Sequence, residues 1–322
     1  MTHGQGISRR SLVRSAAGAV AAAAVARGGA AADAPWRPTY ILASALYGNF
    51  PLADILPEVA KSGAGSIDLW PKPHGTQREE IDTLGEQNVR EMLAVAGVKL
   101  GGIACYSIGA FKLAGEFALA KRLGAEAPVL VTMAPGKGDV PGDELAAAIK
   151  DFLENLRPSI AAAEEVGGLI AIENHSNSLL RTPDSVRRFA DAVTSDRVGV
   201  ALAPHHLPQD AHLIATLARD LGPRMKFVYA QQDGKGSKEK LPKEVELLQM
   251  PGRGPLDFGP LMRELAAQRF AGPVEIFMHP VPRGVPILDT VPAITAEVNR
   301  ARAYLEAVLQ ESVPGTDSGR AG

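Results

Sequence analysis

The sequence has a single cysteine, Cys105, in 322 residues, which excludes an internal disulfide framework. Acidic and basic residues nearly cancel to a net charge of −2, and no stripe of lysine and arginine with interleaved aromatics is present. We therefore expect no binding to nucleic acid. Beyond residue 34, no apolar run approaches the ~18 residues of a membrane-spanning helix. With 46% hydrophobic and 22% charged residues, the composition predicts a soluble globular protein.

Residues 1–34 have the pattern of a twin-arginine export signal. Arg9 and Arg10 are adjacent, an alanine-rich run covers residues 16–26, and small residues follow at 30–34. Because this pathway carries proteins that are already folded, it agrees with the scarcity of cysteine. A disordered basic tail or an uncleaved anchor is the alternative interpretation. We expect a periplasmic or extracellular protein that is free of the membrane after signal cleavage.

From residue 38 to 310, short apolar runs alternate with longer amphipathic stretches. The eight apolar runs are Tyr40–Leu46, Ser66–Trp70, Leu100–Tyr106, Pro128–Met133, Leu169–Glu173, Val198–Ala203, Met225–Ala230 and Pro273–Met278. The amphipathic stretches are Leu52–Lys61, Arg78–Ala96, Phe111–Leu123, Asp143–Val166, Thr182–Ala192, Leu213–Leu221, Asp257–Gln268 and Val291–Leu309. Alternating strands and helices indicate right-handed βαβ units and a parallel sheet.

Eight such units over about 270 residues predict a single closed (β/α)8 TIM barrel, a fold that typically needs ~250 residues. An open doubly wound sheet is the competing architecture. It is disfavoured because no apolar run is followed by GxGxxG at the start of a helix. Residues 311–322 are rich in glycine, serine and aspartate, so we expect a disordered tail there.

The segment after the fifth apolar run is the most informative for function. Leu169–Ile172 is apolar on both faces, and it ends in Glu173, Asn174 and His175. A carboxylate at the end of a buried strand is costly to desolvate unless it is paired or binds a metal. Barrel enzymes keep their chemistry at the carboxyl ends of their strands. The sequence therefore predicts that Glu173 belongs to a site, with a loop-capping or arginine-pairing role as the alternative.

Polar side chains also follow the other predicted strands. The histidines at these ends are His74, His175, His205, His206 and His279, five of the seven in the chain. Carboxylate, imidazole and amide groups gathered at one end of a barrel suit a divalent cation. Any one of these histidines could instead be structural, for example by hydrogen-bonding to a backbone carbonyl.

The connection between residues 233 and 255 is unusually long and rich in glycine and lysine. Long loops in compact domains usually serve as lids or binding loops. We expect this one to cover the barrel mouth and to become ordered when a ligand binds.

These motifs resemble the xylose isomerase-like TIM-barrel superfamily of sugar phosphate isomerases and epimerases, which is related to endonuclease IV-type barrels. The resemblance covers about Tyr40 to Leu309. The segments that carry it are Ile172–His175, Pro204–Leu207, Pro251–Asp257 and Gly272–Ile276. It implies that the glutamates of strands five and eight, Glu173 and Glu275, are both metal ligands and acid/base residues.

The sequence departs from the family pattern at two of the four usual ligands. The aspartate of strand six is replaced by Ala203, although His206 is retained, and the histidine of strand seven falls on Ala230. Either Glu173, His206, Gln232 and Glu275 hold the metal, or the metal is weakly bound or absent.

The resemblance implies a metal-dependent isomerase or epimerase that moves a proton next to the carbonyl of a sugar. Glu173 and Glu275 would exchange the proton, with a divalent Mn, Mg, Co or Zn ion polarising the oxygens. The residues expected to hold the sugar are Trp70, His74, His175, His279 and Arg283. One alternative is a lyase or hydrolase of an oxidised glycoside, and another is a non-catalytic sugar-binding barrel. The expected partner is a small carbohydrate, and a homo-oligomer is compatible with the resemblance.

Overall fold

The computed structural model describes Met1 and residues 35–311. Apart from Met1 and Glu311, the predicted export signal and the predicted tail lie outside these residues. Eight parallel strands close into a barrel in sequence order, which confirms the predicted fold. The strands are β1 (Thr39–Ala43), β2 (Ser66–Leu69), β3 (Lys99–Ala104), β4 (Val129–Met133), β5 (Leu169–Glu173), β6 (Val198–Leu202), β7 (Met225–Ala230) and β8 (Pro273–Ile276).

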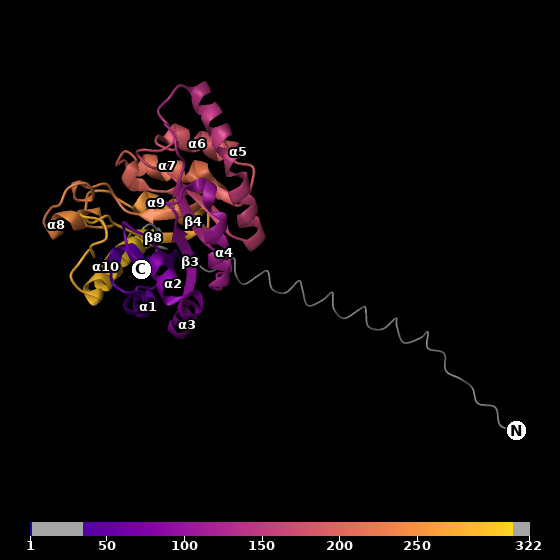
Figure 1. Ribbon diagram of the computed structural model, residues 1–322. Helices are drawn as coiled ribbons and strands as arrows, with labels where there is room; N and C mark the ends of the chain where they lie inside the picture. The colour runs from indigo at the N-terminus through magenta and orange to yellow at the C-terminus, as the bar shows by residue number, and fades with distance from the viewer. Residues whose placement is uncertain (2–34, 312–322) are drawn as a thin grey trace. The chain divides into compact units, whose positions relative to one another are not determined.

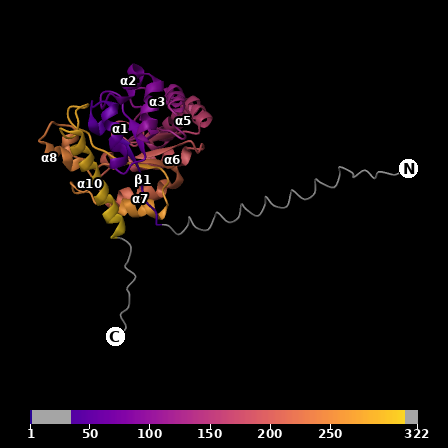
Figure 2. The same ribbon diagram turned by 90° about the horizontal axis from the view of Figure 1, so that it is seen from below.

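Helices surround the strands on the outside (Figures 1 and 2). They are α1 (Leu52–Lys61), α2 (Gln77–Leu84), α3 (Glu86–Ala96), α4 (Ala114–Arg122), α5 (Gly142–Val166), α6 (Pro183–Ala192), α7 (Ala211–Leu221), α9 (Gly259–Ala267) and α10 (Val291–Gln310), whereas the short α8 (Lys243–Glu246) lies in the connection between β7 and α9. The strands are apolar on both faces because one face fills the barrel and the other packs against these helices.

Local sequence signals account for where several elements begin and end. The helix predicted over residues 78–96 is two helices, because Gly85 adopts a φ of 84° between α2 and α3. Helix α6 begins at a capping box in which Thr182 and Ser185 exchange hydrogen bonds. The first strand is shorter than predicted, because Ser44–Tyr47 form a 3-10 turn.

The connection between β7 and α9 differs from the expected glycine-rich lid. It contains the short helix α8 between two 3-10 turns, Lys235–Ser237 and Leu247–Gln249. Its second half is packed into the protein, since Gln249 and Met250 are fully buried. Gly252, with a φ of 75°, lies against the ring of Tyr304, where an added Cβ would come within 2.5 Å of the ring. Only the first half faces the barrel mouth, so ordering on ligand binding stays a prediction for that half alone.

A buried ion pair fastens this connection to the last helix. Arg253 donates to both carboxylate oxygens of Glu297 at 2.7 and 2.6 Å, and Arg300 donates to the same carboxylate at 2.8 Å. The Glu297 side chain is 5% exposed. Two guanidinium groups thus supply hydrogen-bond donors to both oxygens of this deeply buried carboxylate.

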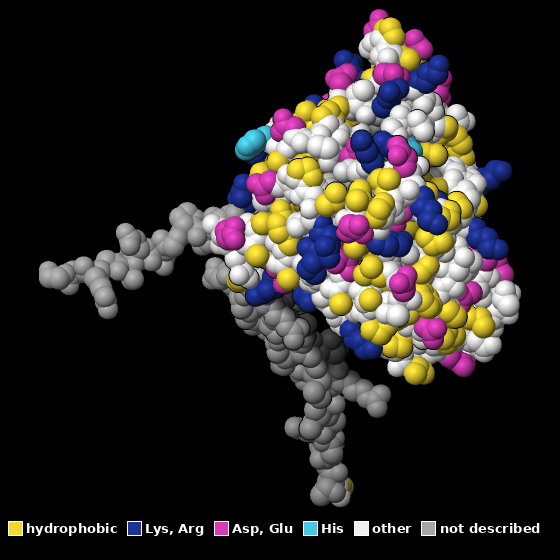
Figure 3. Space-filling model, turned by 90° about the vertical axis from the view of Figure 1, so that its left-hand side faces the viewer, with side chains coloured by type: hydrophobic (Ala, Val, Ile, Leu, Met, Phe, Trp, Pro, Cys, Tyr) yellow, Lys and Arg dark blue, Asp and Glu magenta, His cyan; other side chains and the backbone are white. Residues whose placement is uncertain are grey.

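On the face of the molecule shown in Figure 3, acidic and basic side chains are interspersed with apolar ones. Among the residues that the structure describes, no helix combines the length and apolar character required to cross a membrane.

We predict that Glu297→Ala lowers the free energy of unfolding by about 2–4 kcal/mol, because two arginines lose their buried partner. Glu306→Ala is the control, since its pair with Arg302 is more accessible, at 32% and 29% exposure. That change should cost less than about 1 kcal/mol. Urea denaturation measures both, and equal losses in the two variants would contradict the anchoring role of Glu297.

Candidate functional site

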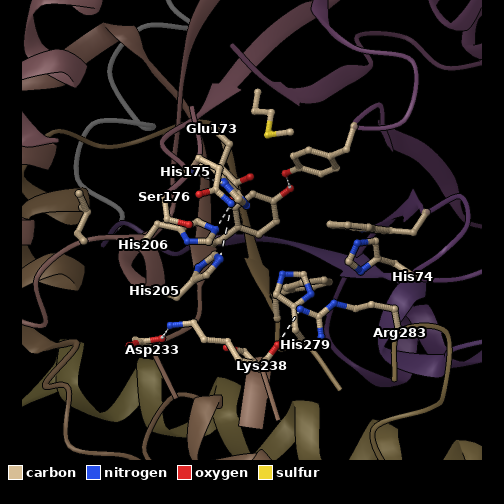
Figure 4. Close-up of a pocket in the computed structure, with 18 residues that line it drawn as sticks. His74, Glu173, His175, Ser176, His205, His206, Asp233, Lys238, His279 and Arg283 are labelled. Carbon is tan, nitrogen blue, oxygen red and sulfur yellow. Dashed lines mark hydrogen bonds and ion pairs between the residues drawn. The ribbon is translucent and has the colours of Figure 1, made fainter. Parts of the chain in front are cut away.

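A cavity of about 540 Å³ opens at the carboxyl ends of the strands (Figure 4). All five histidines predicted from the strand ends line it, together with Trp70, Glu173 and Arg283. The other lining residues are Tyr106, Met133, Ser176, Asn177, Leu207, Tyr229, Asp233, Ser237, Lys238 and Phe277. Its volume is within the usual range for small-molecule sites.

Three of these side chains are arranged to hold a metal ion. One ligand atom each from Glu173, His175 and His206 can be chosen so that all lie within 4.8 Å of one another. Nε2 of His206 lies 3.8 Å from a Glu173 carboxylate oxygen and is buried without a hydrogen-bond partner. One carboxylate and two imidazoles form a donor set suited to a divalent ion such as zinc.

The ionisation states of the two imidazoles fit the same purpose, whereas the Glu173 carboxyl group has to release its proton when a cation binds. Burial raises the pKa of Glu173 to about 8, against the opposing effect of a hydrogen bond with Tyr106. Burial lowers the pKa of His175, and burial together with His175 and Lys238 lowers the pKa of His206 to about 3. Both imidazoles are therefore neutral at pH 7, which is the form that binds metals.

His175 can bind a metal through either ring nitrogen only if its present hydrogen bonding changes. Its Nδ1 accepts a hydrogen bond from the backbone N–H of Asn177 at 3.2 Å. In this neutral form the ring proton is on Nε2. Ligation through Nε2 would require the proton to move to Nδ1 and this hydrogen bond to be released.

The ends of β5 and β6 are fastened together by the side chain of Asn174. Its amide oxygen accepts from the Ala203 N–H at 2.7 Å, and its amide nitrogen donates to the Ala203 carbonyl at 2.9 Å. The 3-10 turn Pro204–His206 follows directly, so Asn174 fixes where His206 lies relative to Glu173. Ala203, which takes the place of the aspartate that the resemblance implies, therefore has both backbone groups hydrogen-bonded to Asn174.

Glu275 is not in the cavity, so the predicted meeting of Glu173 and Glu275 across an ion is corrected. Residues two apart on a strand share a face, and Glu275 lies two residues before Phe277, as Asp68 lies two before Trp70. The rings of Trp70 and Phe277 stack at 4.7 Å and line the cavity, whereas Asp68 and Glu275 are fully buried and do not. The charge of Asp68 raises the pKa of Glu275, and the carboxyl oxygens of both residues are buried without a hydrogen-bond partner. Glu275 therefore faces the barrel interior, as predicted, but it lies beneath the residues that line the cavity.

Gln232 is also placed away from the predicted metal site. Its amide nitrogen donates to the Met250 carbonyl at 3.0 Å, and its amide oxygen accepts from the Leu256 N–H at 2.8 Å. Both ends of the side chain therefore serve the β7–α9 connection. The residue of β7 that lines the cavity is Tyr229, and alternation turns Ala230 to the other face.

Two tyrosines of the cavity were not predicted. The hydroxyl groups of Tyr106 and Tyr229 lie 3.0 Å apart. Alternation along β7 could have identified Tyr229, because it shares a face with Phe227. Tyr106 is the last residue of the third apolar run, and nothing in the sequence around it indicated a place in the site.

A second group of predicted residues lies across the cavity from Glu173. The ring centres of His74 and His279 are 5.0 Å apart, and Arg283 lies beside them (Figure 4). Gln249 holds the backbone of His279 on both sides: its amide nitrogen donates to the carbonyl at 2.9 Å, and its oxygen accepts from the N–H at 3.1 Å. The packed half of the β7–α9 connection thus fixes this wall.

Residues 56–290 match the family described as Xylose isomerase-like TIM barrel, so the chain belongs to that family. No curated protein matches the chain.

Solved structures of the same fold share few residues with this chain. The IOLI protein, whose crystal structure contains a bound zinc atom, aligns with a TM-score of 0.64 at 17% identity over 85% of this chain and 98% of its own. D-psicose 3-epimerase in the presence of D-fructose gives 0.62 at 15% identity, over 84% and 99%. The probable 3-DHS dehydratase AsbF from Bacillus anthracis gives 0.60 at 14% identity, over 84% and 98%. Likeness at this identity establishes the fold.

We predict that Glu275→Gln makes the protein more stable at alkaline pH. Burial, followed by the charge of Asp68, raises the pKa of Glu275, and burial raises that of Asp68. The folded protein therefore binds more protons than the unfolded chain, and its stability falls as the pH rises toward the folded pKa values.

Thermal unfolding from pH 6 to pH 9 tests this prediction. The wild type should lose on the order of 2 kcal/mol more over this range than Glu275→Gln, because the amide cannot ionise. Glu164→Gln, at an exposed position of α5, is the control and should follow the wild type. Parallel curves for the wild type and Glu275→Gln would contradict a carboxyl pair that shares a proton.

We further predict that metal affinity depends on Glu173 and not on Glu275. Zn²⁺ titration against a competing chelator should show that Glu173→Gln weakens binding by roughly 100-fold or more, because a charged ligand is lost. Glu275→Gln should bind Zn²⁺ within about threefold of the wild type. A comparable loss in both variants would restore the four-ligand arrangement predicted from the sequence.

Proposed function

We propose that this protein is a metal-dependent enzyme that moves a proton next to the carbonyl group of a sugar or sugar derivative. The single observation that carries the proposal is the Glu173, His175 and His206 triad within a deep, histidine-rich cavity. Structural relatives whose names state a sugar epimerase or a dehydratase give further support. The predicted export of the protein remains part of the proposal.

In this proposal Glu173, His175 and His206 hold a divalent cation, which when bound polarises the oxygens of the substrate. The stacked rings of Trp70 and Phe277 form an apolar floor on which one face of a sugar ring can lie. His205 contributes a buried imidazole, 3.8 Å from a Glu173 carboxylate oxygen, with neither ring nitrogen hydrogen-bonded.

A second candidate reaction is elimination, that is, a lyase acting on an oxidised sugar or glycoside. Epimerisation by two carboxylates needs one on each side of the substrate, and the burial of Glu275 leaves one in the metal-binding part of the cavity. Elimination next to a carbonyl needs a base and a donor for the leaving group. The paired hydroxyls of Tyr106 and Tyr229 are donors placed in the same cavity.

Both reactions begin with removal of a proton next to a carbonyl, so exchange in D₂O tests them together. We predict that protein loaded with Zn²⁺ or Mn²⁺ incorporates deuterium into at least one member of a panel of D-fructose, D-tagatose and 3-keto glycosides, as followed by NMR. Glu173→Gln should reduce the exchange rate by roughly 100-fold or more. Arg181→Gln, which changes an exposed ion pair with Asp139, should not affect it. The products then separate epimerisation from elimination.

Exchange that survives chelation or Glu173→Gln would contradict the proposed role of the metal. Tight sugar binding without exchange, unaffected by chelator, would instead identify a sugar-binding barrel.

A further inference from the structure

The side of the cavity that faces the triad carries a positive charge without a negative partner. Arg283 lies at this wall beside His74 and His279 (Figure 4), and the ring of Trp70 meets that of His74 edge-on, with the ring centres 5.2 Å apart. Its guanidinium group donates through Nη1 to the Pro280 carbonyl at 2.6 Å and through Nη2 to the Ser237 carbonyl at 2.8 Å. Both acceptors are neutral.

Two other partly buried arginines of the chain are paired with carboxylates. Arg78 makes paired hydrogen bonds to the carboxylate of Glu116, and Arg253 does so with Glu297. Over the part of the chain that the structure describes, no aspartate or glutamate forms an ion pair with Arg283. A partly buried cation held only by neutral carbonyls leaves its charge available to a ligand.

The groups around Arg283 do not offset this charge. Burial lowers the pKa of Arg283 itself. Burial and then Arg283 lower the pKa of His74 to about 4. The pKa of His279 is lowered further, by burial first and then by Arg283, His74, His206 and His175. The two imidazoles are therefore neutral hydrogen-bonding groups beside a fixed positive charge.

The two carboxyl groups that line the cavity, those of Asp233 and Glu173, interact with other residues. Asp233 pairs with Lys238 at 3.7 Å on the mouth side. Glu173 lies with the metal-binding histidines. His279 adds a specific donor or acceptor, because its Nδ1 is buried and has no hydrogen-bond partner.

We propose that Arg283, His279 and His74 form a subsite for an anionic group, a carboxylate or a phosphate, carried by the sugar substrate. The inference rests on the proposed function only in placing the substrate in this cavity. The planar guanidinium group binds two oxygens of a carboxylate or of a phosphate with paired hydrogen bonds, and the flanking imidazoles donate further ones. The wall is held rigidly, because Gln249 fixes the His279 backbone and Ser237 fixes the Arg283 side chain. Neutral hydroxyl groups would leave the charge uncompensated.

Isothermal titration with matched sugar pairs tests this subsite. D-galacturonate is compared with D-galactose, and D-fructose 6-phosphate with D-fructose. In at least one pair the anionic member should bind roughly 10- to 100-fold more tightly than the neutral one. The pair that shows the preference identifies the source of the charge as carboxylate or phosphate.

Two substitutions at one position separate charge from structure. Arg283→Gln should abolish the preference, whereas Arg283→Lys, which keeps the positive charge, should retain part of it. Arg181→Gln is the control and should leave the preference unchanged. Equal affinities within both pairs, a preference that survives Arg283→Gln, or no binding of either anionic sugar at millimolar concentration would each overturn the proposal.

The titrations are run with Zn²⁺ and again after removal of metal with EDTA, and Zn²⁺ stoichiometry is measured separately. If the protein binds no metal but keeps the Arg283-dependent preference, the subsite stands and the proposed function fails. If it binds metal and exchanges protons but shows no preference, the subsite fails alone.

Discussion

The stacking of Trp70 on Phe277 divides the interior of the barrel into two compartments that place opposite demands on carboxyl groups. Below the stack, Asp68 and Glu275 are fully buried, and their raised pKa values favour a shared proton. Above it, Glu173 lies among neutral imidazoles that can share a cation with it. Glu275 precedes Phe277 by two residues, about 6.6 Å along the chain, and this step places its carboxyl group behind the ring that lines the cavity.

The cavity depends as much on amide side chains as on titratable ones. Asn174 joins β5 to the turn that carries His206, and Gln249 holds His279 from the opposite side. Each uses both ends of its amide on backbone groups of one residue. Such bidentate contacts fix position without adding charge, so the electrostatics of the cavity are left to its histidines, arginine and carboxylates.

The fold could be predicted from the sequence because apolar strands and amphipathic helices differ in period and length. The residues that line the cavity were also largely predictable, since strand ends converge in a barrel: Glu173, Trp70 and Arg283 all lie there. How deep a side chain lies inside the barrel was not predictable in the same way. Alternation gives the face of a residue, but the stagger between neighbouring strands decides which layer it occupies.

The roles of Gln232 and of the loop that follows it depend on the local path of the chain. The sequence predicts Gln232 as a metal ligand, whereas the chain leaves the barrel there and uses this amide inside a loop. In the connection over residues 233–255, the burial of Gln249 and Met250 depends on contacts with distant segments. Composition carries no information about such contacts.

The loop that begins at Gln232 is closed at its base by Gln249. The Gln232 N–H donates to the Gln249 carbonyl at 3.0 Å, and the Gln231 amide donates to the Gln249 side chain at 2.9 Å. Because hydrogen bonds join its two ends, the segment between them can be replaced by another sequence while the barrel keeps its structure. The stretch from Asp233 to Glu246, which supplies Ser237 and Lys238 to the rim, is therefore a natural module for transplanting new substrate preferences onto this barrel.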